Sequence, residues 1–160
     1  MWYIIMSTIK FKFISDENNP KYHLIYVMLC NIFPDMMGYK TFTRYTASIA
    51  HINNDHVAFT LLEFDKLLKS MTIVSLGVKE EYRGNKIGKL YINWIKSKYP
   101  DHDIYLHVSI RNENAVKLYK STGFKIIKTQ KEYYSDMGYE PYVKNGLDAY
   151  YMKYTAISVK

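Results

Sequence analysis

Residues 112–124, which read NENAVKLYKSTGF, constrain the fold of this chain more than any other segment. Its apolar and small side chains recur at helical spacing and form one buried stripe: Ala115, Leu118, Tyr119 and Thr122. Asn112 can cap the first helical turn, and Gly123 stands where a helix ends in the left-handed conformation. Because Phe124 then begins an apolar run, the segment predicts a capped helix, a glycine stop and a strand.

A second motif lies upstream at residues 76–90, which read LGVKEEYRGNKIGKL. An apolar strand runs there into a loop with two glycines and then into a helix. Such a junction presents backbone N–H groups and the positive end of the helix to an anion. Arg83, Lys86 and Lys89 add positive charge. Taken alone, the loop is equally well explained as a turn, but the helix at residues 112–122 favours the anion site.

The rest of the chain predicts one domain, residues 1–160, in which strands and helices alternate. We expect strands at residues 8–14, 47–52, 57–64, 71–78, 103–109, 124–134 and 148–153. We expect helices at residues 21–31, 87–98 and 112–122, with a short one at residues 39–45. The polar residues 53–56 predict a hairpin turn, and Pro100 ends the helix that precedes it.

Composition limits the classes of function. The single cysteine, Cys30, excludes an intramolecular disulfide and a cysteine-rich metal site, so we expect a reducing, cytoplasmic location and no metal. A net charge of +7 suits nucleic acid, an anionic membrane or a cofactor with several phosphates. The lysines are scattered, and the longest strongly apolar run, residues 24–30, is far shorter than the about 18 residues that span a bilayer. We therefore predict neither a nucleic-acid nor a membrane partner.

Taken together, the two motifs resemble the acetyl-CoA-binding core of the GNAT acetyltransferase superfamily, over residues 71–154. The resemblance implies an α/β GNAT fold, in which a mixed central sheet of about seven strands is flanked by about four helices. It also implies acetyl-CoA as the cofactor. The cofactor-binding residues that it implies are Leu76, Gly77, Val78, Arg83, Gly84, Asn85, Lys86, Ile87, Gly88, Lys89, Asn112, Ala115 and Tyr119.

Lys86 departs from the family pattern. The superfamily loop usually reads Arg/Gln-x-x-Gly-x-Gly, and Lys86 replaces the first of those glycines. Either the backbone at Lys86 does not have a positive φ, or it is strained there. The lysine side chain either contacts a cofactor phosphate or is simply solvated.

A narrower resemblance concerns the acceptor. The strand Ile104-Tyr105-Leu106-His107-Val108 and the pair Tyr133-Tyr134 are similar to the protein N-terminal acetyltransferases of the NatE and NatF kind, which favour initiator methionine. The resemblance implies His107 as the catalytic base and Tyr119 as the proton donor to the leaving thiolate. The substrate-binding residues that it implies are Phe33, Pro34, Tyr39, Val74, Tyr133 and Tyr134. Without the resemblance, the simpler interpretation is structural: His107 is a hydrogen-bonded histidine of the sheet, Tyr119 is an aromatic residue of the core, and Asn112 is a helix cap.

Thr72 stands where those enzymes carry a catalytic tyrosine, so the set of acid and base groups is small. A weak base suits an α-amine, whose pKa lies about 2.6 units, or about 3.5 kcal/mol, below that of lysine. We therefore expect acetylation of a peptide or protein N-terminus, Met-initiated, by direct attack of the amine. The alternatives are a GNAT enzyme that acetylates a small amine or an internal lysine, and a non-catalytic acyl-CoA-binding module. The sequence does not reveal an auxiliary subunit.

Overall fold

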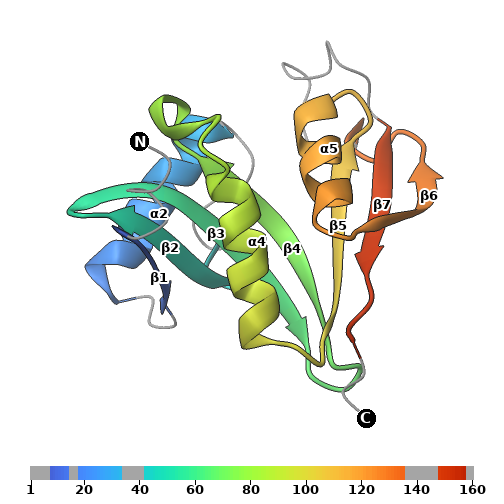
Figure 1. Cartoon of the computed structure of the whole chain (residues 1–160), viewed down its shortest axis with the longest axis horizontal. Helices are drawn as coiled ribbons and strands as arrows, with labels where there is room; N and C mark the ends of the chain where they lie inside the picture. The colour runs from blue at the N-terminus through green and yellow to red at the C-terminus, as the bar shows by residue number, and fades with distance from the viewer. Residues whose placement is uncertain (1–7, 15–17, 34–41, 136–147, 158–160) are drawn as a thin grey trace.

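The computed structural model describes residues 8–14, 18–33, 42–135 and 148–157, which form a seven-stranded sheet with helices on both faces (Figure 1). The strands are β1 (Ile9–Ile14), β2 (Thr46–Ile52), β3 (Asp55–Asp65), β4 (Ser70–Val78), β5 (Asp103–Ser109), β6 (Lys125–Gln130) and β7 (Ala149–Tyr154). The helices are α2 (Pro20–Ile32), α4 (Ile87–Lys98) and α5 (Glu113–Ser121), and η1 (Glu80–Tyr82) is a single 3₁₀ turn. The sheet order is β1-β2-β3-β4-β5-β7-β6, and β4 with β5 is its parallel pair.

The predicted class and order of elements are confirmed, and the helix ends follow local chemistry. The side chain of Asn19 accepts a hydrogen bond from the backbone of Lys21 at the start of α2. Asn112 caps α5 in the same way, and Gly123, with φ +86°, follows its last turn. The structure describes three α-helices where about four were expected. Of the short helix predicted at residues 39–45, residues 39–41 lie outside the described part, Phe42 is helical, and residues 43–45 form a turn and bend.

The strand predicted at residues 124–134 is too long, because β6 ends at Gln130. Residues 131–134 form a turn in which Glu132 adopts a positive φ of 51°. The carboxylate of Asp148 accepts a hydrogen bond from the backbone of Glu132 at 3.0 Å and pairs with Lys131 at 2.7 Å. These contacts turn the chain away from β7 before the strand can continue.

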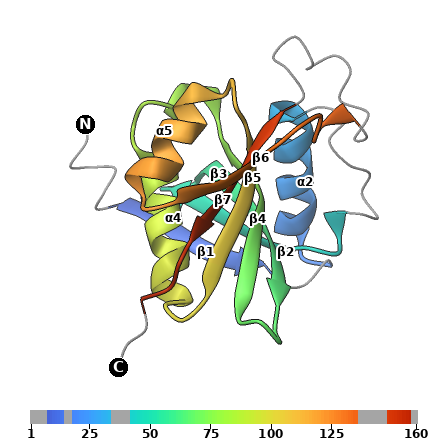
Figure 2. The same cartoon turned by 90° about the vertical axis from the view of Figure 1, so that its right-hand side faces the viewer.

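The sheet has α2 on one face and α4 with α5 on the other (Figure 2). Two apolar clusters hold these layers together. One cluster joins α2 to β2 and β3 on one face of the sheet, through side chains such as Leu29, Ile49 and Phe59. The other joins α4 and α5 to the opposite face, where Tyr91 and Tyr119 pack against Ile73 and Leu106. Burial of these side chains is the main stabilising contribution to the fold.

A bulge in β4 opens the centre of the sheet. Leu62 of β3 pairs with Ile73 and Leu61 pairs with Ser75, so Val74 is an extra residue in β4. The parallel pairing of β4 with β5 covers Ser70 to Ile73 and stops at the bulge. Beyond it the two strands diverge, and the two halves of the molecule form the arms of a V (Figure 1).

Candidate active site

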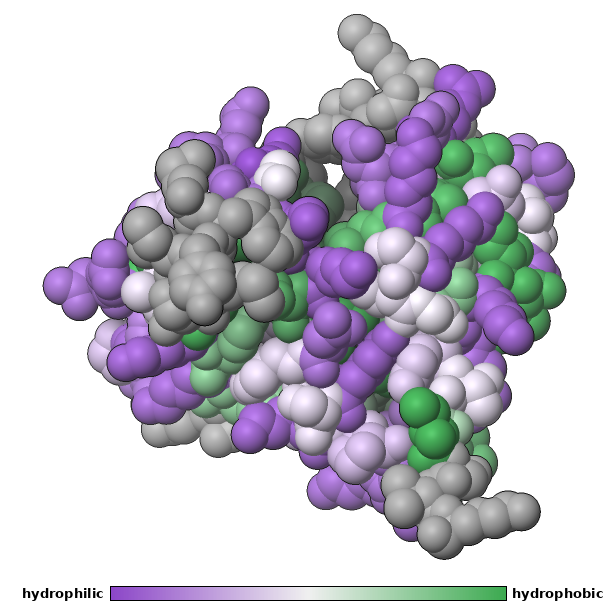
Figure 3. Space-filling model, in the orientation of Figure 1, coloured by the Kyte–Doolittle hydropathy of each residue, from purple (hydrophilic) through white to green (hydrophobic). Residues whose placement is uncertain are grey.

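The opening between β4 and β5 brings together most of the predicted site. Leu76, Gly77 and Val78 lie beyond the bulge, where β4 pairs with β3 and no longer with β5. Their strand therefore presents an edge to the opening, and a ligand with amide groups can pair with such an edge. The surface between α4 and α5 is hollowed at the upper end of this opening (Figure 3).

Gly77 has a packing role on the other face of β4. A Cβ atom at Gly77 would lie 2.5 Å from a ring carbon of Phe59 and 3.0 Å from the side chain of Ile32. Only a residue without a side chain lets α2 and β3 approach β4 this closely. The glycine that the family resemblance assigned to the cofactor thus also shapes the wall behind it.

The N-terminus of α4 is equipped for an anion. Lys86 occupies its cap position with φ 54° and ψ 16°, in the left-handed region, and no side chain caps the helix. The first turn contains no acidic residue, whereas α2 and α5 are each capped by an asparagine. The first backbone N–H groups of α4 and its positive dipole end are therefore available, and Arg83, Lys86 and Lys89 are exposed around them. These features fit the pyrophosphate of the predicted cofactor.

The loop that leads into α4 is tied to the β2–β3 hairpin. Asp55 accepts hydrogen bonds from Nζ of Lys79 and from the hydroxyl of Tyr82, both at 2.7 Å. The hydrogen bond from Lys79, and to a smaller extent the one from Tyr82, lowers the pKa of the Asp55 carboxyl. Nδ2 of Asn85 donates to the carbonyl of Tyr82 within the loop. Side-chain hydrogen bonds thus fix residues 79–85, the loop that is predicted to lead to the phosphate site, to the hairpin.

The two glycines of this loop differ in role. Gly84 has φ +78° and open space around the position of a Cβ, so backbone conformation is what it provides. Gly88 lies in α4, where a Cβ would come within 2.9 Å of a methyl carbon of Leu118 on α5. Gly88 therefore permits α4 and α5 to touch, and Ile87 beside it is buried in the core. On α5, Ala115 is half-buried against the same core.

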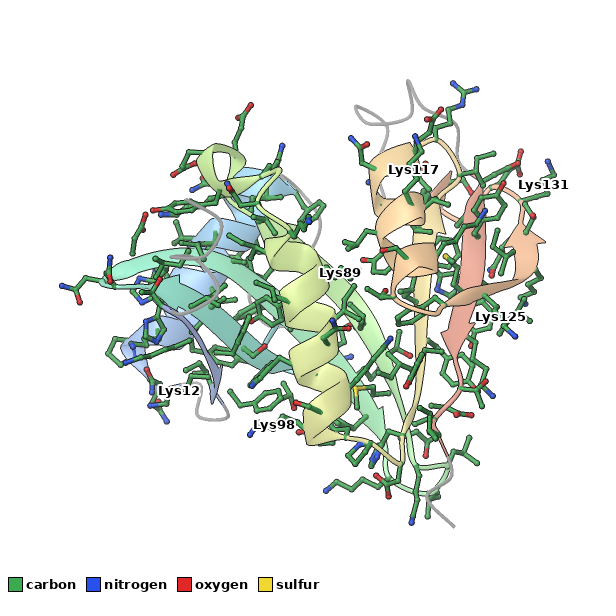
Figure 4. All side chains as sticks on the ribbon, viewed as in Figure 1. Lys12, Lys89, Lys98, Lys117, Lys125 and Lys131 are labelled. Carbon is green, nitrogen blue, oxygen red and sulfur yellow. The ribbon has the colours of Figure 1, made fainter. Side chains whose placement is uncertain are left out.

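Basic side chains line both helices at this opening. Figure 4 shows Lys89 on α4 and Lys117 on α5. Lys117 is in an exposed i,i+4 pair with Glu113 at 3.3 Å.

Asn112, predicted to contact the pantetheine arm, accepts a hydrogen bond from the backbone of Ala115, so its side chain acts as a helix cap. The position of Asn112 at the first turn of α5 is compatible with the predicted contact as well.

His107 lies in a column of aromatic rings on the face of β5 that is turned away from α5. The ring of Tyr133 stacks on it with centroids 3.9 Å apart, and the ring of Tyr151 lies at 4.7 Å. Tyr105 continues the column beside Tyr151 at 5.6 Å. Nε2 of His107 is 3.2 Å from Oε1 of Gln130, and this hydrogen bond fixes the orientation of the ring. The predicted pair of His107 and Tyr133 is therefore brought together.

Burial lowers the pKa of His107 below its usual value. The hydrogen bond to Gln130 acts in the opposite direction, because its oxygen stabilises the protonated ring, and the charge of Lys128 lowers the pKa further. At neutral pH the ring is mostly neutral. A neutral imidazole can accept a proton, as the predicted base must.

Tyr119 lies on the other face of β5. It is 8% exposed in the core under α5, edge-on to Phe124 with centroids 5.6 Å apart. Burial raises its pKa to about 12. The phenol therefore keeps its proton at neutral pH, which a proton donor needs. Tyr119 is at once the core aromatic and a candidate acid.

Two of the predicted substrate residues, Phe33 and Val74, lie against the cluster under α2. Phe33 caps the C-terminus of α2, and both it and Val74 of the β4 bulge pack against the α2 cluster. Tyr133 and Tyr134 meet edge-to-face at 4.9 Å in the turn after β6. Burial raises the pKa of Tyr133, and the nearby Tyr45 and Tyr151 raise it further. Pro34 and Tyr39 lie outside the described residues.

Sequence reasoning missed Gln130 and Tyr151, which contact His107 directly. Strand alternation in residues 148–153 could have placed Tyr151 and the buried Met152 on different faces of one strand. The strand that pairs with it was not evident from the sequence. Sequence reasoning also missed Ser75, whose hydroxyl is the one buried side-chain polar atom among the described residues that lacks a hydrogen-bond partner. Thr72 is half-buried on β4, in register with Tyr105 of β5.

The sequence model of the acetyltransferase (GNAT) family matches residues 12–124, which is more than half of the chain. The chain belongs to this family. The matched segment contains the loop predicted to bind phosphate, His107 and Tyr119. Within the described residues of this GNAT domain, no helix is long and apolar enough to cross a membrane, and no cluster of His, Cys, Asp or Glu could hold a metal ion.

Curated relatives of this GNAT domain include N-terminal acetyltransferases. The chain is 34% identical over 96 residues to an N-alpha-acetyltransferase of Sulfurisphaera tokodaii, a match over 58% of this chain and 52% of the relative. It is 34% identical over 94 residues to N-alpha-acetyltransferase 50 of Danio rerio, over 55% of this chain and 56% of the relative. The chain thus spans about half the length of the curated relatives it matches.

A solved structure has the same fold. Arabidopsis thaliana Naa50 in complex with the bisubstrate analogue CoA-Ac-MVNAL superposes with a TM-score of 0.74 at 24% identity. The superposition covers 92% of this chain and 99% of that protein. At this identity the likeness establishes the GNAT fold.

Proposed function

We propose that this chain is an N-terminal acetyltransferase that transfers the acetyl group of acetyl-CoA to the α-amine of Met-initiated polypeptides. The observation that carries the proposal is the position of His107. It faces the open side of the split sheet with its pKa lowered, stacked under Tyr133. The names of the curated relatives that match at 34% identity support an α-amine acceptor.

The cofactor is acetyl-CoA. When bound, it supplies the acetyl group as a thioester, whose carbonyl carbon the amine attacks. We assign its pyrophosphate to the N-terminus of α4, where Arg83 and Lys86 add charge, and its pantetheine arm to the edge of residues 76–78 that β5 does not pair. Nε of Arg83 donates to the carbonyl of Val78 at 3.1 Å on this segment, so the arm pairs there with the remaining backbone groups. Tyr119 and Ala115 on α5 form the opposite wall of this cofactor site.

His107 acts as the base in this proposal. As the C–N bond forms, the substrate nitrogen must lose a proton, and the neutral His107 ring accepts it directly or through a water molecule. Tyr119 acts as the acid, because its buried phenol donates a proton to the sulfur as the C–S bond breaks. The two residues lie on opposite faces of β5, so each reaches the split sheet from its own side.

The small set of catalytic groups favours an α-amine over lysine. Thr72 replaces the tyrosine of the resembling enzymes, and Tyr133 supplies a phenol beside His107 instead. A histidine with a lowered pKa is a weak base, and about 3.5 kcal/mol less is needed to deprotonate an α-amine than a lysine. Phe33, Val74 and the Tyr133-Tyr134 pair offer apolar surface to a first methionine.

A panel of acceptors tests the proposal. Acetyl-CoA is supplied with Met-initiated peptides, the same peptides with a blocked N-terminus and an internal lysine, and small amines, and release of CoA is followed. We expect turnover with the free peptides alone, and a loss of about 10²-fold or more in His107→Ala. Equal turnover with the blocked peptides would transfer the assignment to lysine, and CoA binding without any turnover would make the chain a binding module.

A further inference from the structure

A lysine lies in register with the proposed base across three strands. His107 of β5 pairs with Tyr151 of β7, and Tyr151 pairs with Lys128 of β6. Residues directly opposite one another in neighbouring strands share a face of the sheet. Nζ of Lys128 lies 5.5 Å from the centre of the Tyr151 ring, which in turn lies 4.7 Å from the His107 ring.

An irregularity in β6 creates this register. Ile126 pairs with Met152, and the next pair is Lys128 with Tyr151, so Ile127 is an extra residue in the edge strand. Without the bulge, Ile127 would stand opposite Tyr151. The bulge therefore places a cation, and not an apolar side chain, on the face that carries His107.

Lys128 has no carboxylate partner in the described part of the chain, in contrast to Lys153 on the adjacent strand and Lys131 after the same strand. Lys153 pairs with Asp103 at 2.6 Å, and Lys131 pairs with Asp148 at 2.7 Å. Among the described residues no carboxylate oxygen lies within ion-pair distance of Lys128, whose side chain is exposed. It is also the charge that acts on His107, since its field lowers the pKa of that ring.

The cofactor phosphates do not account for this cation. Their proposed site is the N-terminus of α4, and α4 packs on the face of the sheet opposite to His107. Lys128 shares instead the face on which the peptide is proposed to lie, beside Tyr133. An extended peptide advances about 3.3–3.6 Å per residue, so the cation is within about three residues of the amine at His107.

We propose that Lys128 binds a carboxylate of the substrate, so that the preferred N-termini carry Asp or Glu at one of positions two to four. This proposal rests on the N-terminal acetyltransferase function proposed above and names its substrate class. A solvent-exposed ion pair of this kind is expected to favour the acidic peptide about threefold to fivefold. Because the pair is exposed, added salt weakens the preference.

Matched peptides test this inference. Met-initiated peptides carrying Asp or Glu at position two, three or four are compared with isosteric Asn or Gln peptides, and kcat/KM is measured for each. The protein as it stands is compared with Lys128→Gln and Lys128→Glu. Lys125→Gln is the control, because Lys125 is exposed on the same strand, away from the His107 row (Figure 4).

We expect a threefold to fivefold preference for an acidic peptide in the unaltered protein and in Lys125→Gln, none in Lys128→Gln, and a reversed preference in Lys128→Glu. Equal kcat/KM for acidic and amide peptides, or a preference that survives Lys128→Gln, overturns the inference while leaving N-terminal acetylation intact. Failure of every peptide to react would instead overturn the proposed function on which it rests.

Discussion

The ring of Tyr133 covers the ring of His107, with centroids 3.9 Å apart and planes inclined by 9°. Tyr133 belongs to the turn after β6, and His107 to the central strand β5. The contact therefore joins a turn that Asp148 holds to the floor of the split sheet. It is also part of the burial that lowers the pKa of His107.

Removal of this cover should change the pH dependence of the reaction. In Tyr133→Ala the His107 ring is more exposed, so its lowered pKa rises toward the ordinary value near 6.5. More of the base is then protonated at a given pH, and the acidic limb of kcat/KM moves to higher pH. Tyr133→Phe keeps the stacked ring and serves as the control. Identical acidic limbs in Tyr133→Ala and the unaltered protein would contradict the role of His107 as base.

Substitution of Tyr119 separates the roles of acid and core aromatic. Tyr119→Phe keeps the ring under α5 and removes the phenolic proton, so we expect kcat to fall about 10²-fold or more while the melting temperature changes little. The matched control is Tyr91→Phe, which removes the hydrogen bond between the Tyr91 and Ser48 hydroxyls. That variant should lose about 1 kcal/mol of stability and retain its turnover. If Tyr119→Phe turns over normally, the acid lies elsewhere.

The left-handed backbone conformation of Lys86 predicts that the loop before α4 is strained. It holds the left-handed conformation that a glycine adopts without cost, with φ 54°. Lys86→Gly should stabilise the protein by up to about 1 kcal/mol, because relief of strain outweighs the greater freedom of the unfolded chain. Lys86→Ala removes the charge and keeps the strain. Urea unfolding of both variants measures the backbone effect, and CoA titration of both measures the charge. Lower stability of Lys86→Gly than Lys86→Ala would show that the backbone is not strained.

The lowered pKa of Lys96 predicts that the free energy of unfolding rises with pH. It extends from α4 to donate a hydrogen bond to the carbonyl of Thr122, over the ring of Tyr154, and burial lowers its pKa to about 8. Between about pH 8 and pH 10.4 the unfolded chain keeps the lysine proton and the folded chain has lost it, so unfolding becomes less favourable as pH rises.

Urea unfolding at pH 7.5 and 9.5 measures this effect. The unaltered protein should gain stability over this interval relative to Lys96→Met, which has no titrating group at that position. The comparison cancels the tyrosines, which titrate in both proteins. Equal changes in the two proteins would mean that the Lys96 ammonium is as well solvated when folded as when unfolded.

Local sequence signals predicted most of the fold. The stripe from Ala115 to Thr122, the cap at Asn112 and the stop at Gly123 each act within one or two helical turns, and each is present. The end of β6 could not be predicted in this way. It depends on Asp148, which is 16 residues from Glu132 in the chain and binds its backbone.

The candidate site also combines residues that local motifs predict with residues that depend on distant contacts. His107 and Tyr119 were predicted from motifs whose residues are contiguous in the sequence. The contacts of Gln130 and Lys128 with the His107 row depend on strand register, which the extra Ile127 shifts by one residue. Because a shift of one residue exchanges the two faces of a strand, hydrophobic alternation alone does not reveal which side chains meet.

One measurement tests the central claim most directly. A single Met-initiated peptide with one internal lysine is incubated with the protein and acetyl-CoA, and tandem mass spectrometry locates the added acetyl group. The proposed function predicts acetylation of the α-nitrogen of methionine, with the lysine unmodified and the reaction lost in His107→Ala. Acetylation of the lysine ε-nitrogen at an equal or greater rate would contradict it.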